Sequence, residues 1–326
     1  MSTSPRLATQ QGALRAVKSI DLEELGEAAA EIQGRSPWQL AWARLRNDRT
    51  ALASIIVIVL ITLVAIFAPL IARLVGHGPF EQFPYTALNG YGLPVGPGRT
   101  FFFGADDLGR DVLVRTAYGA RISLIAGVVA SGVAVIIGGV VGMVAGYYGT
   151  VVDTALSRFM DVILSFPLLL FAIALVSIVG PSLTVTIAVI AFFSWAVVGR
   201  IIRGQTLSLR EKEFVEAARS LGASDLRIMF VDILPNLVAP LLVYATLLIP
   251  ASIVFEATLS FLGLGVVPPT PSWGNMLSDA EPYYKVAWWY IIFPGGALLL
   301  TTLAFNLLGD SVRDALDPRY ARLFKA

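Results

Sequence analysis

The sequence contains no cysteine and only one histidine among its 326 residues. Without cysteine the chain cannot form a disulfide, and it lacks the thiolate ligands of zinc knuckles and iron–sulfur clusters. The histidine, His77, lies in a Gly/Pro-rich segment, where we expect an ordinary surface residue rather than a metal ligand. Charged residues make up 14% of the chain, against about 25% in typical soluble domains. These shortages argue against a metal or redox protein and against a soluble fold.

Sequence patterns for nucleotide chemistry are also missing. No G-x-x-x-x-G-K-[ST] segment occurs, so the chain encodes no phosphate-cradling loop of that kind. No paired carboxylates or serine–histidine pair stands at catalytic spacing. The net charge is only +1 and no basic cluster alternates with aromatic residues, which argues against a nucleic-acid partner. We therefore expect a protein that is not an enzyme and that holds no cofactor or metal of its own.

What the chain has in excess is apolar sequence, because hydrophobic residues make up 56% of it. They fall into long runs that suit a hydrocarbon core about 30 Å thick. The pattern predicts an all-α polytopic membrane protein with six transmembrane helices. Pro167 is expected to bend the third one early. The predicted spans cover residues 52–75, 122–148, 162–179, 183–202, 237–262 and 287–308.

The polar segments complete the predicted organisation. Residues 1–50 form an N-terminal tail with an amphipathic helix at 36–49, in which Trp38 and Trp42 suit the lipid headgroup layer. Residues 51–75 are the first span, and residues 76–118 are an extracytoplasmic insert. Residues 119–309 are a core of five helices, and 310–326 are a cytoplasmic tail.

Lysine and arginine are distributed unevenly between the two sides. The segment before the first span has seven, the segment 203–227 has five and the tail has four, against three in the insert and one in the last loop. Because these residues gather on the cytoplasmic side of membrane proteins, both termini are expected there.

A ridge of small side chains runs along the second predicted span. In lipid, where apolar burial gives no net attraction between helices, such a ridge allows two backbones to approach closely. We therefore predict a helix-packing seam. Its members recur every four residues: Ala126, Ala130, Ala134, Gly138, Gly142 and Gly146.

A polar, helix-prone island at residues 211–235 separates the fourth and fifth spans. The pattern predicts a helix over 211–221 with Phe214, Ala218 and Leu221 on one stripe. Gly222 follows where the chain needs a positive φ. Ser224 or Asp225 is expected to cap a second short helix, which Pro235 closes. A loop of a few residues would suffice to join two spans, so we expect this island to be a docking site.

The island also carries a resemblance to a known family. The residues Glu216, Ala217, Ala218, Gly222, Leu234 and Pro235 resemble the EAA loop of membrane subunits in binding-protein-dependent ABC importers; Asp232 departs from that pattern, which usually has isoleucine there. The segments FGADDLGRD (103–111), GARISL (119–124), EATLSFLGLG (256–265) and PPTPSWG (268–274) are similar to the C-type subunit of the dipeptide, oligopeptide and nickel permease branch. The resemblance covers roughly residues 100–320.

This resemblance implies a type I ABC importer permease fold in a bacterial-type cytoplasmic membrane. It implies a heterodimer with a second homologous permease, two cytoplasmic ATPases that bind ATP and Mg²⁺, and an extracytoplasmic binding protein that delivers the cargo. It also implies alternating access, in which the six island residues named above couple the ATPases to the membrane helices. The expected cargo is a di- or oligopeptide, with nickel or another small solute as the alternative.

Glu256 supports a competing hypothesis. A charge inside a span costs about 2.5–3.5 kcal/mol, so this side chain should face protein or water rather than lipid. It is the residue that an ion-coupled secondary transporter would use as a proton relay. It lies only seven residues before Gly263, so a role in the pathway or in helix packing near the outer mouth is the other interpretation.

Overall fold

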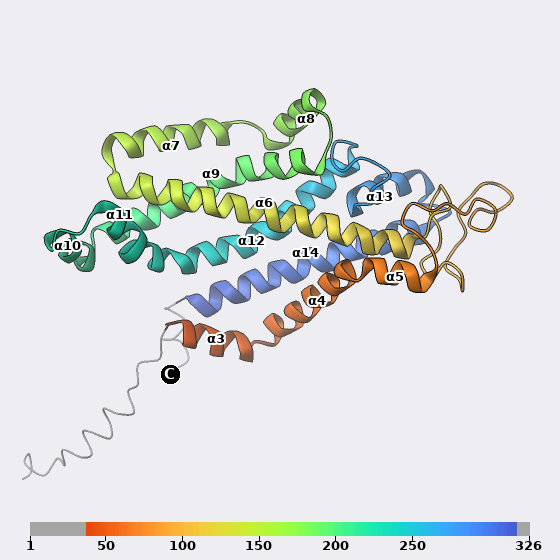
Figure 1. The fold of residues 1–326 in the computed structure, drawn as a ribbon, viewed down its shortest axis with the longest axis horizontal. Helices are drawn as coiled ribbons and strands as arrows, with labels where there is room; N and C mark the ends of the chain where they lie inside the picture. Colours follow the sequence, from red (N-terminus) through yellow and green to blue (C-terminus); the bar gives the residue numbers. More distant parts are fainter. Residues whose placement is uncertain (1–36, 318–326) are drawn as a thin grey trace, which may run out of the picture.

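The computed structural model describes residues 37–317, and within that range the chain forms helices and loops with isolated β-bridges but no strand. Figure 1 shows long helices side by side, with α10 at one end of the molecule and the segment 76–111 at the other. The elements are α3 (Pro37–Asn47), α4 (Arg49–Ile66), α5 (Ala68–Val75), α6 (Val112–Tyr148), α7 (Thr150–Ser165), α8 (Leu168–Val179), α9 (Leu183–Arg210), α10 (Glu213–Ser220), α11 (Asp225–Arg227), the π-helix η1 (Ile228–Ile233), α12 (Leu234–Phe261), α13 (Trp273–Ala280), the 3₁₀-helix η2 (Glu281–Tyr283) and α14 (Trp288–Leu316).

The all-α membrane fold is confirmed. Between residues 37 and 317, five helical segments are long and apolar enough to cross a membrane: α4, α6, α9, the segment from α11 through α12, and α14. The bent pair α7 and α8 makes a sixth crossing when it is counted as one span.

The third span is bent at Pro167, as predicted, but the bend is a complete break, so residues 162–179 do not form one helix. The chain breaks at Phe166–Pro167, and the axes of α7 and α8 differ by 81°. Phe166 is extended, with φ −78° and ψ 133°, since a residue that precedes proline is disfavoured in the helical region. When α7 and α8 are counted as one span, that span starts at Thr150 rather than at residue 162.

Three predicted boundaries also shift. The first span, predicted as 51–75, is two helices that meet at Phe67, where Pro69 in the first turn of α5 removes a backbone donor. The insert, predicted as 76–118, ends at Asp111, because this side chain caps α6 by accepting from the backbone N–H of Val114 at 3.1 Å. The last helix continues to Leu316, beyond the predicted limit of 309.

The predicted interface helix is observed as α3. Arg44 Nη1 donates to the carbonyl oxygens of Ala315 at 3.2 Å and Asp317 at 3.1 Å, which ties α3 to the end of α14. Trp42 is 67% exposed, as a helix in the headgroup layer requires. Ser36, the first residue of the predicted helix, lies outside the described range together with the rest of the tail and residues 318–326. Contact between α3 and lipid stays a prediction.

The small-residue ridge of α6 is buried inside the helix bundle. All six of its residues are buried. A Cβ atom added at Gly138 would lie 2.5 Å from the carbonyl oxygen of Trp195, and one added at Gly146 would lie 2.6 Å from Cβ of Thr206. The glycine half of the ridge therefore lets the backbones of α6 and α9 touch, and this pair forms the centre of the fold.

Candidate functional site

The polar island lies at one end of the helix bundle (Figure 1). Its turn is as predicted, because Gly222 has φ +79° and ends the first helix. Ser224 caps α11 and accepts a hydrogen bond from the N–H of Arg227 at 3.4 Å. The prediction that Pro235 closes the second helix is wrong. A proline is tolerated in the first turn of a helix, and Pro235 occupies that place in α12, so the chain passes from η1 into the fifth span without a break.

The buried face of the island differs from the predicted stripe. Val215 is fully buried, whereas Phe214 is 43% exposed and Leu221 is 88% exposed. Val215 packs with Ile228 and Ile233 against the C-terminal halves of α6 and α9. Leu226, Phe230 and Val231 are also exposed. The island thus presents apolar side chains away from its own chain, which is typical of a surface that a partner covers.

Polar contacts fix the island to the helix ends. The hydroxyl of Tyr147, at the end of α6, donates to Asp225 Oδ1 at 2.7 Å. Arg219 lies over the ring of the same tyrosine, 6.0 Å from its centroid. At the end of α9, Arg210 Nη1 donates to the carbonyl oxygen of Gly146 at 3.1 Å. These contacts join the island to the end of α6 and join the ends of α6 and α9 to each other, and the backbone continues from η1 into α12.

The structure places the six predicted coupling residues in two groups. One group lies on α10 and its turn: Glu216 and Ala217 are exposed, Ala218 is half-buried, and no atom lies within 4 Å of a Cβ added at Gly222. The other group is Leu234, half-buried, and Pro235, exposed, in the first turn of α12. The structure brings both groups to the same end of the bundle, and their role in coupling stays a prediction.

Glu256 does not belong to this site. It lies near the far end of α12, where it is fully buried. Its carboxylate accepts from the hydroxyl of Ser123 on α6 at 2.9 Å and from Ser260 at 2.7 Å. The N–H of Val266 in the next loop donates to Ser260 Oγ at 3.1 Å. Glu256 therefore faces protein, and its contacts join α6, α12 and the outer loop.

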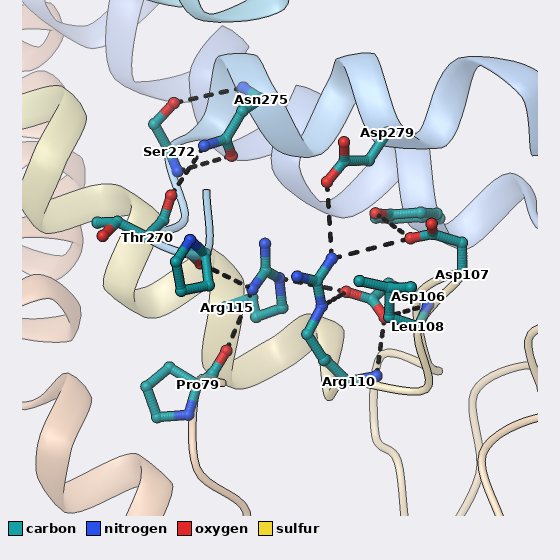
Figure 2. A network of polar contacts seen from close by, with 12 residues as sticks. Pro79, Asp106, Asp107, Leu108, Arg110, Arg115, Thr270, Ser272, Asn275 and Asp279 are labelled. Carbon is teal, nitrogen blue, oxygen red and sulfur yellow. Dashed lines mark hydrogen bonds and ion pairs between the residues drawn. The ribbon is translucent and has the colours of Figure 1, made fainter. Parts of the chain in front are cut away.

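At the opposite end of the molecule, buried charges hold the insert in place (Figure 2). Asp106 is fully buried and accepts from Arg110 Nε at 2.5 Å. Arg115 Nε lies 3.3 Å from the same carboxylate, and Arg110 Nη2 lies 3.6 Å from Asp279 on α13. Burial raises the pKa of Asp106, and the two guanidinium groups act in the opposite direction.

Arg115 extends this outer ion network to two separate loops. Its Nη1 donates to the carbonyl oxygen of Pro79 at 3.1 Å and to that of Pro269 at 3.3 Å (Figure 2). The insert and the last outer loop are thus held against the start of α6. A structural role for Asp106, Arg110 and Arg115 was not predicted from the sequence. The one signal for it is that Asp106 and Arg110 are four residues apart, with opposite charges.

His77 is not the ordinary surface residue that the sequence suggested. Its side chain is 11% exposed, and Nδ1 lies 2.7 Å from Asp111 Oδ2. Its ring lies 4.8 Å from that of Phe101 and 4.6 Å from that of Phe83. The Gly/Pro-rich insert has a small apolar core of its own, which composition did not reveal.

We expect Asp106→Asn to destabilise the outer face by about 3–5 kcal/mol, because it leaves two buried guanidinium groups without their carboxylate. Asp107→Asn is the matched control. Asp107 is 24% exposed, its pair with Arg110 is long, at 3.8 Å, and an asparagine oxygen can still accept from the hydroxyl of Tyr290, so the change should cost less than about 1 kcal/mol. Thermal unfolding and protease cleavage of the insert in the purified complex measure both effects. Equal stability of the two variants would contradict the role given to Asp106.

Comparison with known proteins places the chain in a family. Residues 138–322 match the model described as "binding-protein-dependent transport system inner membrane component", and residues 36–90 match the N-terminal transmembrane domain of oligopeptide transport permease C. Three relatives are each 43% identical. They are the dipeptide transport system permease protein DppC of Alkalihalophilus pseudofirmus (87% of this chain, 90% of the relative), the glutathione transport system permease protein GsiD of Escherichia coli (88% and 92%) and the oligopeptide transport system permease protein OppC of Escherichia coli (89% and 93%).

The helical fold and the family match define a multi-pass membrane transport subunit. The chain belongs to the family of inner membrane components of binding-protein-dependent transport systems, in its C-type permease branch. Membership implies that an ATPase and a binding protein work with it.

Proposed function

We propose that this chain is one of two different permease subunits in an ATP-driven importer of short peptides. The names of the three relatives, which transport dipeptides, glutathione and oligopeptides, favour peptides over nickel as cargo. The observation that carries the proposal is the island: its inner face is anchored to three long helices, and its outer face exposes apolar side chains. Two cytoplasmic ATPases would supply ATP and Mg²⁺ sites, and this chain would hold no cofactor of its own.

Coupling would proceed through the island as a rigid body. ATP binding closes the ATPases, and the movement passes through residues 211–235 to α6, α9 and α12. The two permease subunits then open toward the binding protein, and ATP hydrolysis restores the inward-open state. The contacts of Tyr147 with Asp225 and Arg219 support this route, because they join the island to the end of α6, and the buried side chain of Val215 joins α10 to the same core.

We place both termini and the island on the cytoplasmic side of a bacterial-type cytoplasmic membrane. The Lys/Arg-rich segments support this orientation, since α3, α10 and the C-terminal end of α14 share one end of the bundle in Figure 1. The insert and α13 lie at the opposite end, where the binding protein would dock.

The test is peptide uptake into proteoliposomes that contain the full complex and binding protein, with and without internal ATP. Uptake that requires ATP and resists an uncoupler is expected. Glu256→Gln should retain uptake within about twofold, because glutamine still pairs with the two serines that Glu256 contacts. ATP-independent, uncoupler-sensitive accumulation that disappears in Glu256→Gln would establish an ion-coupled carrier instead.

A further inference from the structure

Helix α7 has three distinct faces, and one of them is polar and exposed. Met160 and Ile163 are buried in the apolar core. A second face exposes apolar side chains, including Val151 at 79% and Val162 at 55%. The third face is polar and repeats at helical spacing: Thr150, Thr154, Ser157, Arg158, Asp161 and Ser165. We refer to these six residues as the α7 stripe.

An exposed ion cluster joins the α7 stripe to α9. Arg200 Nη2 on α9 lies 2.5 Å from Asp161 Oδ1, and Arg158 Nη1 lies 3.7 Å from Asp161 Oδ2. The side chains of Arg158, Asp161 and Arg200 are 81%, 48% and 53% exposed. On α9 the exposed positions Gly204 and Ser208 continue from Arg200 at intervals of four residues. The two helices thus present one continuous hydrophilic surface.

This surface extends well into the span. At about 1.5 Å per residue, the stripe from Thr150 to Ser165 is about 22 Å long, and Asp161 lies about 16 Å from the start of the helix. Lipid cannot cover these groups cheaply, because each charge at the centre of a span costs about 2.5–3.5 kcal/mol. Burial of this surface against another protein is disfavoured too. It would remove water from Arg158, whose only ion pair among the described residues is the long one with Asp161. Contact with water is therefore the environment that we expect for the charges of Arg158, Asp161 and Arg200.

We propose that the α7 stripe and Arg200 line the water-filled, inward-facing half of the translocation path. The adjacent apolar face of α7 would then contact lipid or the second permease. A hydrated surface that carries both positive and negative charges can interact with a peptide, because the backbone of a peptide is polar and its two termini carry opposite charges. This inference rests on the proposed function and orientation, and it goes further by naming the path-lining surface.

Single cysteines test the inference directly, since the natural chain has no cysteine and gives no background. Thr154→Cys and Ser165→Cys sample the stripe. Phe159→Cys and Val162→Cys are controls on the apolar face, where the natural side chains are 51% and 55% exposed. Inverted membrane vesicles that hold the full complex are treated with a membrane-impermeant maleimide, and the label on this subunit is measured. Because an apolar environment disfavours the reactive thiolate, stripe positions should react about tenfold faster than the controls. Trapping the ATP-bound state should slow them.

Labelling of the stripe that does not exceed labelling of the controls, or that is unchanged by nucleotide, overturns the inference. A stripe that reacts only after denaturation identifies a dry subunit contact and also overturns it. ATP-dependent uptake, measured in the same preparation, separates this failure from failure of the proposed function. If uptake requires ATP but the stripe is not labelled, only the assignment of the stripe to the path is wrong. If uptake requires no ATP, the proposed importer function itself is wrong.

Discussion

Replacing Gly222 with valine should abolish peptide uptake while the subunit still assembles in the membrane. The residue has φ +79°, a region that β-branched side chains adopt poorly. No atom lies within 4 Å of an added Cβ, so strain of the turn, about 1–3 kcal/mol, is the dominant effect. Relief of that strain would displace α10 from the position fixed by Tyr147. Uptake and substrate-stimulated ATP hydrolysis should therefore fall together, while the basal activity of the ATPases persists.

Gly222→Asn is the matched control for this variant. Asparagine also adds a Cβ and a polar group, but it enters the left-handed region more readily than valine does. It should retain most of the uptake. Normal uptake by the valine variant would show that the turn takes no part in coupling.

Replacing Gly142 with leucine should prevent recovery of an assembled complex. An added Cβ would overlap the carbonyl oxygen of Gly199 and lie 3.0 Å from the backbone nitrogen of Arg203. Backbone atoms in a helix cannot rotate away as a side chain can, so α6 and α9 must separate. Since this pair is the centre of the fold, co-purification of the partner chains and thermal stability should both be lost.

Gly132→Leu tests whether a large residue on α6 is harmful in itself. No atom lies within 4 Å of a Cβ added at Gly132, so this variant should assemble normally. A Gly142→Leu subunit that assembles as well as Gly132→Leu would contradict the close packing of α6 on α9.

Local signals were enough to predict the features that depend on a few neighbouring residues. The positive φ of Gly222 and the cap at Ser224 follow from the chemistry of a turn between two helices. The apolar runs located α4, α6, α9, α12 and α14 because length and hydropathy decide which segments cross a membrane.

Features that depend on distant partners could not be predicted in the same way. Helix α7 was missed because Asp153, Arg158 and Asp161 interrupt its apolar pattern. Their charges make sense only beside Arg203, which pairs with Asp153, and Arg200, which pairs with Asp161. Both arginines lie on α9, some forty to fifty residues further along the chain.

The orientation of α10 also depends on residues that are distant in the sequence. Its helical period was predictable from sequence, but the buried face is decided by the core that Val215 joins at the ends of α6 and α9. Of the stripe predicted from the sequence, Ala218 packs against this core, whereas Phe214 and Leu221 are exposed. The two backbone carbonyls that accept from Arg115, those of Pro79 and Pro269, carry no sequence signal.

The central claim is that the outward face of the island receives the ATPase, and a photoreactive amino acid at Leu221 tests it most directly. Leu221 is 88% exposed, and Leu74, at the opposite end of the bundle and 78% exposed, is the control. Irradiation of the assembled complex should join the Leu221 variant to an ATPase subunit and should not join the Leu74 variant to it. A complex that transports peptide but gives no ATPase adduct from Leu221 would contradict the claim.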